Sequence, residues 1–129
     1  MIHVLSLAIP ANTPLAAPEE GDVKLGSCII RKVGIEFPRG CYWLAGVRMW
    51  LRAHQLYPTT PGEWLVSEGQ LIEFADNTAV IDSPYEVTVQ AYNLDERYPH
   101  TIRVYLDVEE LSPAGGYLAP ATVLTGYVG

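Results

Sequence analysis

An alternation of apolar and polar residues with a period of two limits the folds that this chain can adopt more than any other feature of its sequence. It runs through four separate segments, at residues 29–37, 43–52, 85–92 and 100–108. A period of two places successive side chains on opposite faces of an extended strand, whereas helical spacing of apolar residues is hard to find here. Ten prolines and eleven glycines also interrupt the chain at short intervals, as turns between short strands require. The pattern predicts an all-β protein.

Weaker patterns indicate further strands at residues 2–9, 63–66, 70–74 and 78–81. Residues 8–22 are expected to form a long loop, and residues 56–64 a turn-rich connection. In the segment 29–37, Ile29, Val33 and Ile35 share one parity, and Arg31 interrupts this inward row, which predicts a bulge or a strand end there. Seven or eight short strands with one apolar face each favour an antiparallel β-sandwich, Ig-like or jelly-roll-like. A small Greek-key barrel is the alternative.

The chain is expected to form one sandwich domain over residues 1–109, followed by a C-terminal extension over residues 110–129. A domain of this size can bury a core without metals or disulfides. The extension is rich in Gly, Ala, Pro and Thr and carries one charge, at Glu110, so it is too apolar for a typical solvated tail. It is an edge strand, an arm that docks on a neighbouring subunit, or a disordered segment. Its candidate docking residues are Tyr117, Leu118, Val123, Leu124 and Tyr127.

Composition and charge exclude several classes of function. The formal net charge of −7 argues against a nucleic-acid partner, because such a partner needs a basic surface. No apolar run reaches the length of a transmembrane helix, and the first residues lack the basic start of a signal peptide. We therefore expect no membrane partner, and synthesis in the cytoplasm. Cys28 and Cys41 are expected far apart, as buried small side chains without an intrachain disulfide.

The segment richest in potential chemistry is AYNLDERYPHTIRVYLDV, residues 91–108. Asn93 and Asp95 are favoured turn residues, and Pro99 suits the start of a strand. We expect a hairpin loop with solvated charges, in which His100 closes the end of the core by a hydrogen bond to loop backbone. The alternative is a catalytic base, but that role needs a paired nucleophile or acid. Because hydrolase, nucleotide-binding and zinc motifs are missing, we expect no enzyme activity, no metal and no cofactor.

A more informative feature is the outward parity of three strands. It carries aromatic and arginine side chains, which are Arg48, Trp50, Arg52, Tyr92, Arg103 and Tyr105. If these strands lie side by side in one sheet, the arginines surround the aromatic rings on one sheet face. Such residues are enriched where proteins meet other proteins. The alternative is that aromatic–arginine pairs only stabilise the sheet.

Three stretches, APEEGDVKL, PGEWLV and PYEVTVQAYNLDERYPHTIRVYL, together resemble small β-sandwich structural proteins of tailed bacteriophages. The resemblance covers roughly residues 2–108, and its motifs are structural. It implies a virion component: a capsid decoration or cement protein, or a tail or neck protein, without a cofactor. Its partners are then other virion proteins, such as the major capsid protein or a tail protein, and it forms a homo-oligomer.

Two functions remain open from the sequence. The first is a structural protein that joins neighbours through the predicted sheet face and the C-terminal arm, since symmetry lets one weak patch act many times. The second is a carbohydrate- or receptor-binding β-sandwich module, in which exposed rings of Trp50, Tyr57, Trp64 or Tyr92 stack on a glycan.

Overall fold

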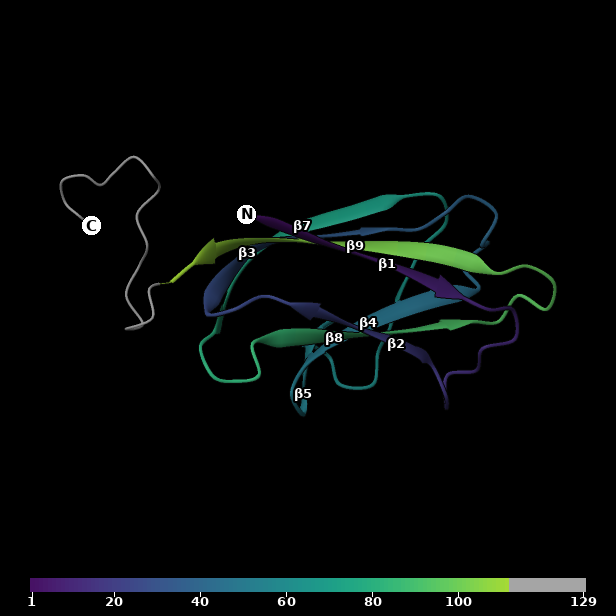
Figure 1. Ribbon diagram of the computed structural model, residues 1–129. Helices are drawn as coiled ribbons and strands as arrows, with labels where there is room; N and C mark the ends of the chain where they lie inside the picture. Colours follow the sequence, from purple (N-terminus) through teal and green to yellow (C-terminus); the bar gives the residue numbers. More distant parts are fainter. Residues whose placement is uncertain (112–129) are drawn as a thin grey trace.

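The chain folds as an antiparallel β-sandwich of two stacked sheets, as the sequence predicts (Figure 1). The structure is a computed structural model that describes residues 1–111. Nine strands occur in this range: β1 (Ile2–Ile9), β2 (Glu19–Lys24), β3 (Cys28–Glu36), β4 (Ala45–Leu51), β5 (His54–Tyr57), β6 (Leu65–Val66), β7 (Leu71–Val80), β8 (Glu86–Asn93) and β9 (His100–Glu110).

The two sheets divide the strands in an order that differs from the order along the chain. Sheet A has the order β1-β9-β3-β7, and sheet B has the order β2-β8-β4-β5, with β6 paired to the same edge of β4 as β5. Every pairing is antiparallel. The consecutive strands β8 and β9 lie in different sheets, so the loop between them crosses from one layer to the other (Figure 1).

The core lies between the sheets and is formed by the inward parity of the strands. In β9 the buried residues alternate with exposed or half-buried ones from His100 to Val108. Facing them from sheet B are the inward residues of β4 and β8, so the two inner faces fill one continuous core. The fully buried side chains include Ile9, Ile30, Val33, Ile35, Phe37, Val47, Met49, Val80, Val87, Val89, Ile102 and Leu106.

The predicted bulge is present at Arg31, where the pairing of β3 with both neighbours shifts between Ile30 and Lys32. The extra residue reverses the parity of the strand, so Cys28 and Ile30 are buried before the bulge and Ile29 is only half-buried. The prediction of Ile29 as an inward residue is therefore wrong. Arg31 bridges the neighbouring strands, because its Nε donates to Glu109 Oε1 at 2.6 Å and its Nη1 donates to Asn77 Oδ1 at 2.5 Å.

Three other elements differ from the prediction. Trp43 lies in a turn before β4, and Arg52 has a φ of 57° that ends β4 and starts a hairpin into β5. The expected loop at residues 8–22 overlaps β2, which is held by its pairing with β8 although only Val23 is buried. Residues 71–80 form one continuous strand instead of two.

The segment 94–99 is a hydrogen-bonded turn, as predicted. Asn93 is fully buried, and its Nδ2 donates to the carbonyl oxygens of Ile9 and Tyr98 at 3.2 and 2.9 Å. Asp95 accepts from the backbone N–H of Arg97 at 2.9 Å. His100 is buried as expected, but its Nε2 lies 2.9 Å from Asp95 Oδ2, a carboxylate and not the predicted backbone group.

Both cysteines are buried and free, as predicted. Cys28 lies at the start of β3, and Cys41 lies in the loop between β3 and β4 with its thiol donating to the Ser67 carbonyl oxygen at 3.1 Å. Burial, together with the nearby carboxylate of Glu110, raises the pKa of the Cys28 thiol to about 11. The thiol is therefore protonated and unreactive near neutral pH.

Candidate interaction surfaces

The outer face of sheet B carries a cluster of aromatic rings around one arginine, which we call the cation–aromatic face (Arg48, Trp50, Trp64, Gln90 and Tyr92). The Arg48 guanidinium lies 5.2 Å from the centroid of the Trp50 ring and 4.2 Å from that of Trp64. The Trp64 ring meets the Tyr92 ring edge to face, with centroids 4.8 Å apart. Each contact has the geometry of a favourable cation–π or aromatic pair.

A single glutamine fixes this cluster. Gln90 Oε1 accepts from Arg48 Nε at 2.8 Å and from Trp50 Nε1 at 3.0 Å. Its Nε2 donates to Glu20 Oε2 at 2.5 Å, which extends the network to β2. The register explains the arrangement, because Glu20 pairs with Gln90 across β2 and β8, and Gln90 pairs with Arg48 across β8 and β4. The face is therefore ordered by cross-strand contacts.

The position of the Tyr92 ring depends on a glycine directly opposite it. Gly46 pairs with Tyr92 across β4 and β8. A Cβ atom at Gly46 would lie 2.3 Å from Tyr92 Cε2, so the ring lies across the bare backbone of β4. This close approach leaves Tyr92 only 7% exposed, and burial raises the pKa of its hydroxyl.

The structure brings together three of the six predicted face residues, Arg48, Trp50 and Tyr92. Arg103 and Tyr105 lie on β9, on the outer face of the opposite sheet, where the Tyr105 hydroxyl donates to Glu36 Oε1 at 2.9 Å. The prediction of a single face was wrong because it assumed that β4, β8 and β9 share one sheet. Arg52 lies in the β4–β5 turn, with its Nη2 donating to the Ser83 carbonyl oxygen at 3.3 Å.

Trp64 belongs to the face but was not predicted there. It lies in the weak pattern of residues 63–66 and directly precedes β6, which has only two residues, so the alternation was too short to assign its side chain to a face. Its side chain reaches the face because β6 pairs with Gly46 and Val47 of β4. The remaining predicted interface residues, Tyr117, Leu118, Val123, Leu124 and Tyr127, lie outside the described residues.

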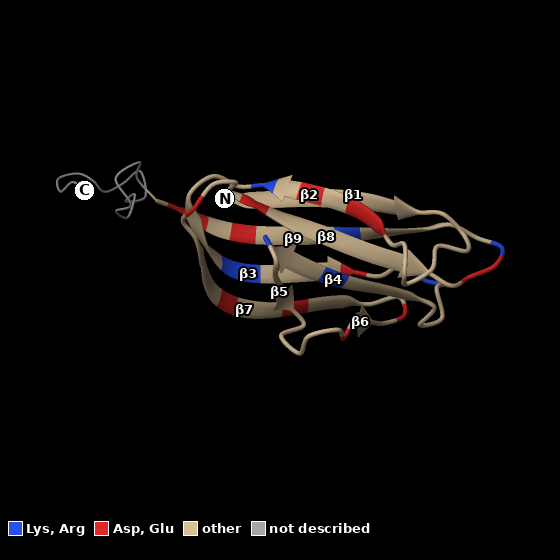
Figure 2. Cartoon of the chain, turned by 90° about the horizontal axis from the view of Figure 1, so that it is seen from below, with Lys and Arg blue, Asp and Glu red and all other residues tan. Residues whose placement is uncertain are grey.

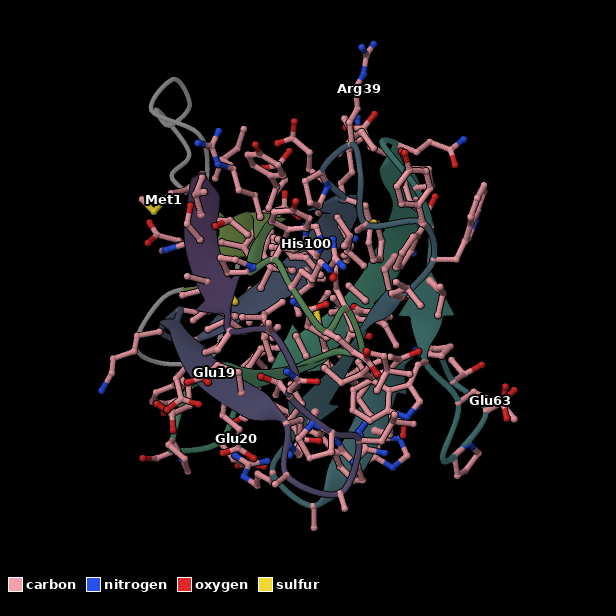
Figure 3. The ribbon with its side chains drawn as sticks, turned by 90° about the vertical axis from the view of Figure 1, so that its right-hand side faces the viewer. Met1, Glu19, Glu20, Arg39, Glu63 and His100 are labelled. Atoms are coloured by element: carbon pink, nitrogen blue, oxygen red, sulfur yellow. The ribbon has the colours of Figure 1, made fainter. Side chains whose placement is uncertain are left out.

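Two exposed aromatic residues lie at one end of the sandwich, which we call the loop end (loops 10–18, 37–44, 67–70 and 94–99). Figure 3 looks onto this end, with His100 near its centre and Arg39 projecting outward. Tyr42 and Trp43 lie in the second of these loops, with φ of 47° and 59°. Their side chains are 67% and 61% exposed. Two consecutive bulky residues in the left-handed region are rare in proteins.

Glu68 from the loop 67–70 holds this conformation. Its Oε1 accepts from the backbone N–H of Tyr42 at 2.6 Å, and its Oε2 accepts from that of Gly40 at 3.1 Å. These two hydrogen bonds hold the pKa of the Glu68 carboxyl below its usual range, and the bond from Tyr42 has the larger effect. The carboxylate thus acts as an anion inside a turn of backbone N–H groups.

A shallow pocket of 240 Å³ lies at the same end. It is lined by Asn12, Pro14, Leu94 and Glu96. The loop that contains Asn12 is tied to the 94–99 loop, because the Asn12 backbone N–H donates to the Asp95 carbonyl oxygen at 2.9 Å. The Leu94 N–H donates to the Leu44 carbonyl oxygen, also at 2.9 Å, so the pocket adjoins the segment that carries Tyr42 and Trp43.

A buried tyrosine and an aspartate form a hydrogen-bonded pair between two strands. The Tyr57 hydroxyl donates to Asp76 Oδ2, and the Thr78 hydroxyl donates to the same oxygen at 2.6 Å. Burial raises the pKa of the Tyr57 hydroxyl above its usual range, and the hydrogen bond to Asp76 adds to this effect.

Within residues 1–111 no group of three His, Cys, Asp or Glu side chains is placed to hold a metal ion. The same residues contain no helix with the length and apolar character to cross a membrane.

Comparison with known proteins gives no relative for this chain: no family model, no curated protein and no solved structure matches it.

Proposed function

We propose that this chain is a non-enzymatic structural protein that joins neighbouring subunits through the cation–aromatic face, with a virion as its setting. The observation that carries the proposal is the stack of Arg48 between Trp50 and Trp64, which Gln90 fixes within the chain itself. Tryptophan, tyrosine and arginine dominate the residues that contribute most to protein–protein binding. Because these side chains are already ordered, a partner that binds them loses little conformational entropy.

The charges around the face suit a second copy of the same chain. Glu20 and Asp22 are exposed on β2, at one margin of the face, whereas Arg48 lies on β4. Figure 2 shows acidic segments on β2 and a basic segment on β4. In a two-fold interface the same patch meets itself after half a turn. The acidic margin of one copy then lies over the basic part of the other.

The virion setting comes from the resemblance of the sequence to structural proteins of tailed bacteriophages. It makes the major capsid protein or a tail protein the further partner, and gives the chain a role in capsid decoration or in the tail. The C-terminal arm is proposed to add a contact of its own, since burial of its apolar side chains contributes about 25 cal/mol per Å² before ordering costs. Repetition by symmetry strengthens such weak contacts.

Sedimentation velocity of point variants tests the proposed face. Trp64→Ala and Arg48→Ala remove the stack, and we expect them to shift the assembly toward the monomer mass of 14.2 kDa. Arg103→Ala is the matched control, because it removes an exposed arginine from the opposite sheet and should leave the mass unchanged. Circular dichroism shows that each variant is folded. If both stack variants keep the wild-type mass, the cation–aromatic face is not the interface.

A further inference from the structure

The loop end concentrates unusual backbone geometry. Four non-glycine residues of the described chain have positive φ, and Asn12, Tyr42 and Trp43 are three of them. An asparagine adopts this region readily, but a tyrosine and a tryptophan do so only at an energetic cost. Residues held in such conformations cluster at binding sites, where the surrounding structure maintains them.

The cost is not offset by burial of the two rings, because each is more than 60% exposed. The backbone of this loop is instead held by hydrogen bonds to the loop 67–70. The Glu68 carboxylate accepts two of them, and the buried Cys41 thiol donates a third to the Ser67 carbonyl oxygen. Hydrogen bonds therefore fix the backbone that carries the two rings, while the rings themselves remain in solvent. A support of this kind presents the rings to a ligand without further ordering.

We propose that the loop end binds a neutral carbohydrate, with Trp43 and Tyr42 as a stacking platform and Asn12 and Glu96 as hydrogen-bonding partners for hydroxyl groups. This site is separate from the cation–aromatic face, so neither proposal depends on the other.

The residue types match the two sides of a sugar ring. The C–H groups of a pyranose form an apolar face that packs on aromatic rings, and Tyr and Trp combine such a ring with a polar group. The adjoining pocket offers the amide oxygen of Asn12, whose Nδ2 donates to the Glu96 carbonyl oxygen at 3.3 Å, a carboxylate at Glu96 and apolar walls at Pro14 and Leu94. Its volume of 240 Å³ is below the roughly 300–1,000 Å³ of pockets for drug-sized ligands. The pocket thus suits one sugar unit, with further units on the platform.

The charged residues of the loop end are the acids Glu68, Asp95 and Glu96 beside Arg39 and Arg97, and this small excess of negative charge favours a neutral ligand over an anionic one. Hydrogen bonds from the backbone of Arg97 and from the His100 side chain lower the pKa of Asp95, and backbone N–H groups lower that of Glu68, so both are ionised near neutral pH. Glu96 adds an exposed acid, and the whole chain has a net charge of −7. Like charges repel a sialylated or sulfated glycan, a nucleic acid or an anionic membrane.

The test is binding of the full chain to an array of neutral and anionic oligosaccharides, followed by titration of the bound neutral glycans. We expect binding to neutral glycans, and a loss of affinity of roughly tenfold or more in Trp43→Ala. Tyr85→Ala is the control, since Tyr85 is an exposed aromatic residue at the opposite end and should leave the affinity unchanged. Asn12→Ala separates the pocket from the platform, and we expect it to weaken binding as well.

Several outcomes would overturn the proposal. These are the absence of binding to any neutral glycan in saturation-transfer NMR at millimolar concentration, binding of anionic glycans alone, and neutral-glycan binding that Trp43→Ala leaves intact. Sedimentation with phosphatidylcholine vesicles provides the other arm, because co-sedimentation that depends on Trp43 without glycan binding assigns the platform to a lipid surface. Thermal unfolding of each variant shows that a lost signal comes from the site and not from the fold.

Discussion

At the scale of single residues, Gly46 decides where the Tyr92 ring lies and therefore how the cation–aromatic face is built. The ring covers the backbone of β4, and its edge contacts Trp64. A side chain at position 46 would displace the ring from that place. The face thus depends on the smallest residue in the sheet as much as on its aromatic residues.

Gly46→Ala is expected to destabilise the fold by about 1–3 kcal/mol, as overpacking does, and to disturb the Trp64–Tyr92 contact. Urea unfolding measures the free energy, and near-ultraviolet circular dichroism reports the rings. Gly34→Ala is the matched control, since its Cβ would lie 3.5 Å from the Tyr105 side chain, an ordinary contact. It should stay within about 1 kcal/mol of wild type, and equal losses in both variants would contradict the role of Gly46.

Glu68 makes the stability of the loop end depend on pH. Its pKa is lowered in the folded state by the backbone N–H groups of Tyr42 and Gly40. Its stabilisation is therefore fully present above the unfolded pKa of about 4.3, and is lost as the pH falls through the lower folded pKa. We expect the melting-temperature advantage of wild type over Glu68→Gln to shrink between pH 6 and about pH 3.

The control for this prediction is Glu63→Gln, which removes one exposed carboxylate and retains Glu68. It should keep the acid-side loss of stability seen in wild type. A constant difference between wild type and Glu68→Gln across this pH range would show that Glu68 does not stabilise the loop in its ionised form.

At the scale of elements, one hydrogen bond joins the two sheets on the side of β5 and β7. Tyr57 belongs to β5 in sheet B, and Asp76 belongs to β7 in sheet A. The Tyr57 ring also packs edge to face on Phe74, with ring centroids 5.2 Å apart. This contact connects the edge strand β7 of sheet A to sheet B. Within sheet A, β3 is the only strand of residues 1–111 that pairs with β7.

Tyr57→Phe keeps the ring and removes the hydroxyl, so we expect it to cost about 1–3 kcal/mol of unfolding free energy, as a hydrogen bond to a charged group does. Tyr105→Phe is the matched control, because its hydroxyl bonds to Glu36 on an exposed sheet face. It should change the free energy by less than about 0.5 kcal/mol. Denaturant unfolding compares the two, and equal changes would mean that the Tyr57–Asp76 bond does not join the sheets.

Most individual strands could be predicted from the sequence, because each carries its own period-two pattern. Arg31 predicted the bulge, since a charged side chain cannot continue an inward row. The strand β2 could not be predicted, because EEGDVK has a single buried side chain and is held by pairing with β8. The end of β4 before Arg52 could not be predicted either. The positive φ of Arg52 is a property of the turn, and an arginine is not a residue type that indicates such a turn.

For the molecule as a whole, the alternation of apolar and polar residues in a strand does not determine to which of the two sheets the strand belongs. The patterns of β8 and β9 are equivalent, and only pairing between distant segments assigns them to different sheets. The sequence could therefore predict that Arg48, Trp50 and Tyr92 face outward, but it could not exclude Arg103 and Tyr105 from the same surface. Tyr42 and Trp43 were missed as a candidate site because their exposure follows from a turn that Glu68 holds from another loop.

Assembly is likewise a property of surfaces and not of individual strands. A preorganised stack of aromatic rings and arginine, bordered by acids, is expected to meet its own copy. An apolar arm is expected to strengthen that contact. We therefore expect the full chain to self-associate.

The most direct test is the solution mass of the full chain by light scattering over a range of concentrations, beside a version that ends at Leu111. We predict a mass that is a multiple of 14.2 kDa for the full chain, and a smaller species for the shortened one. A full chain that remains at 14.2 kDa at every concentration would contradict self-association through the cation–aromatic face and the arm.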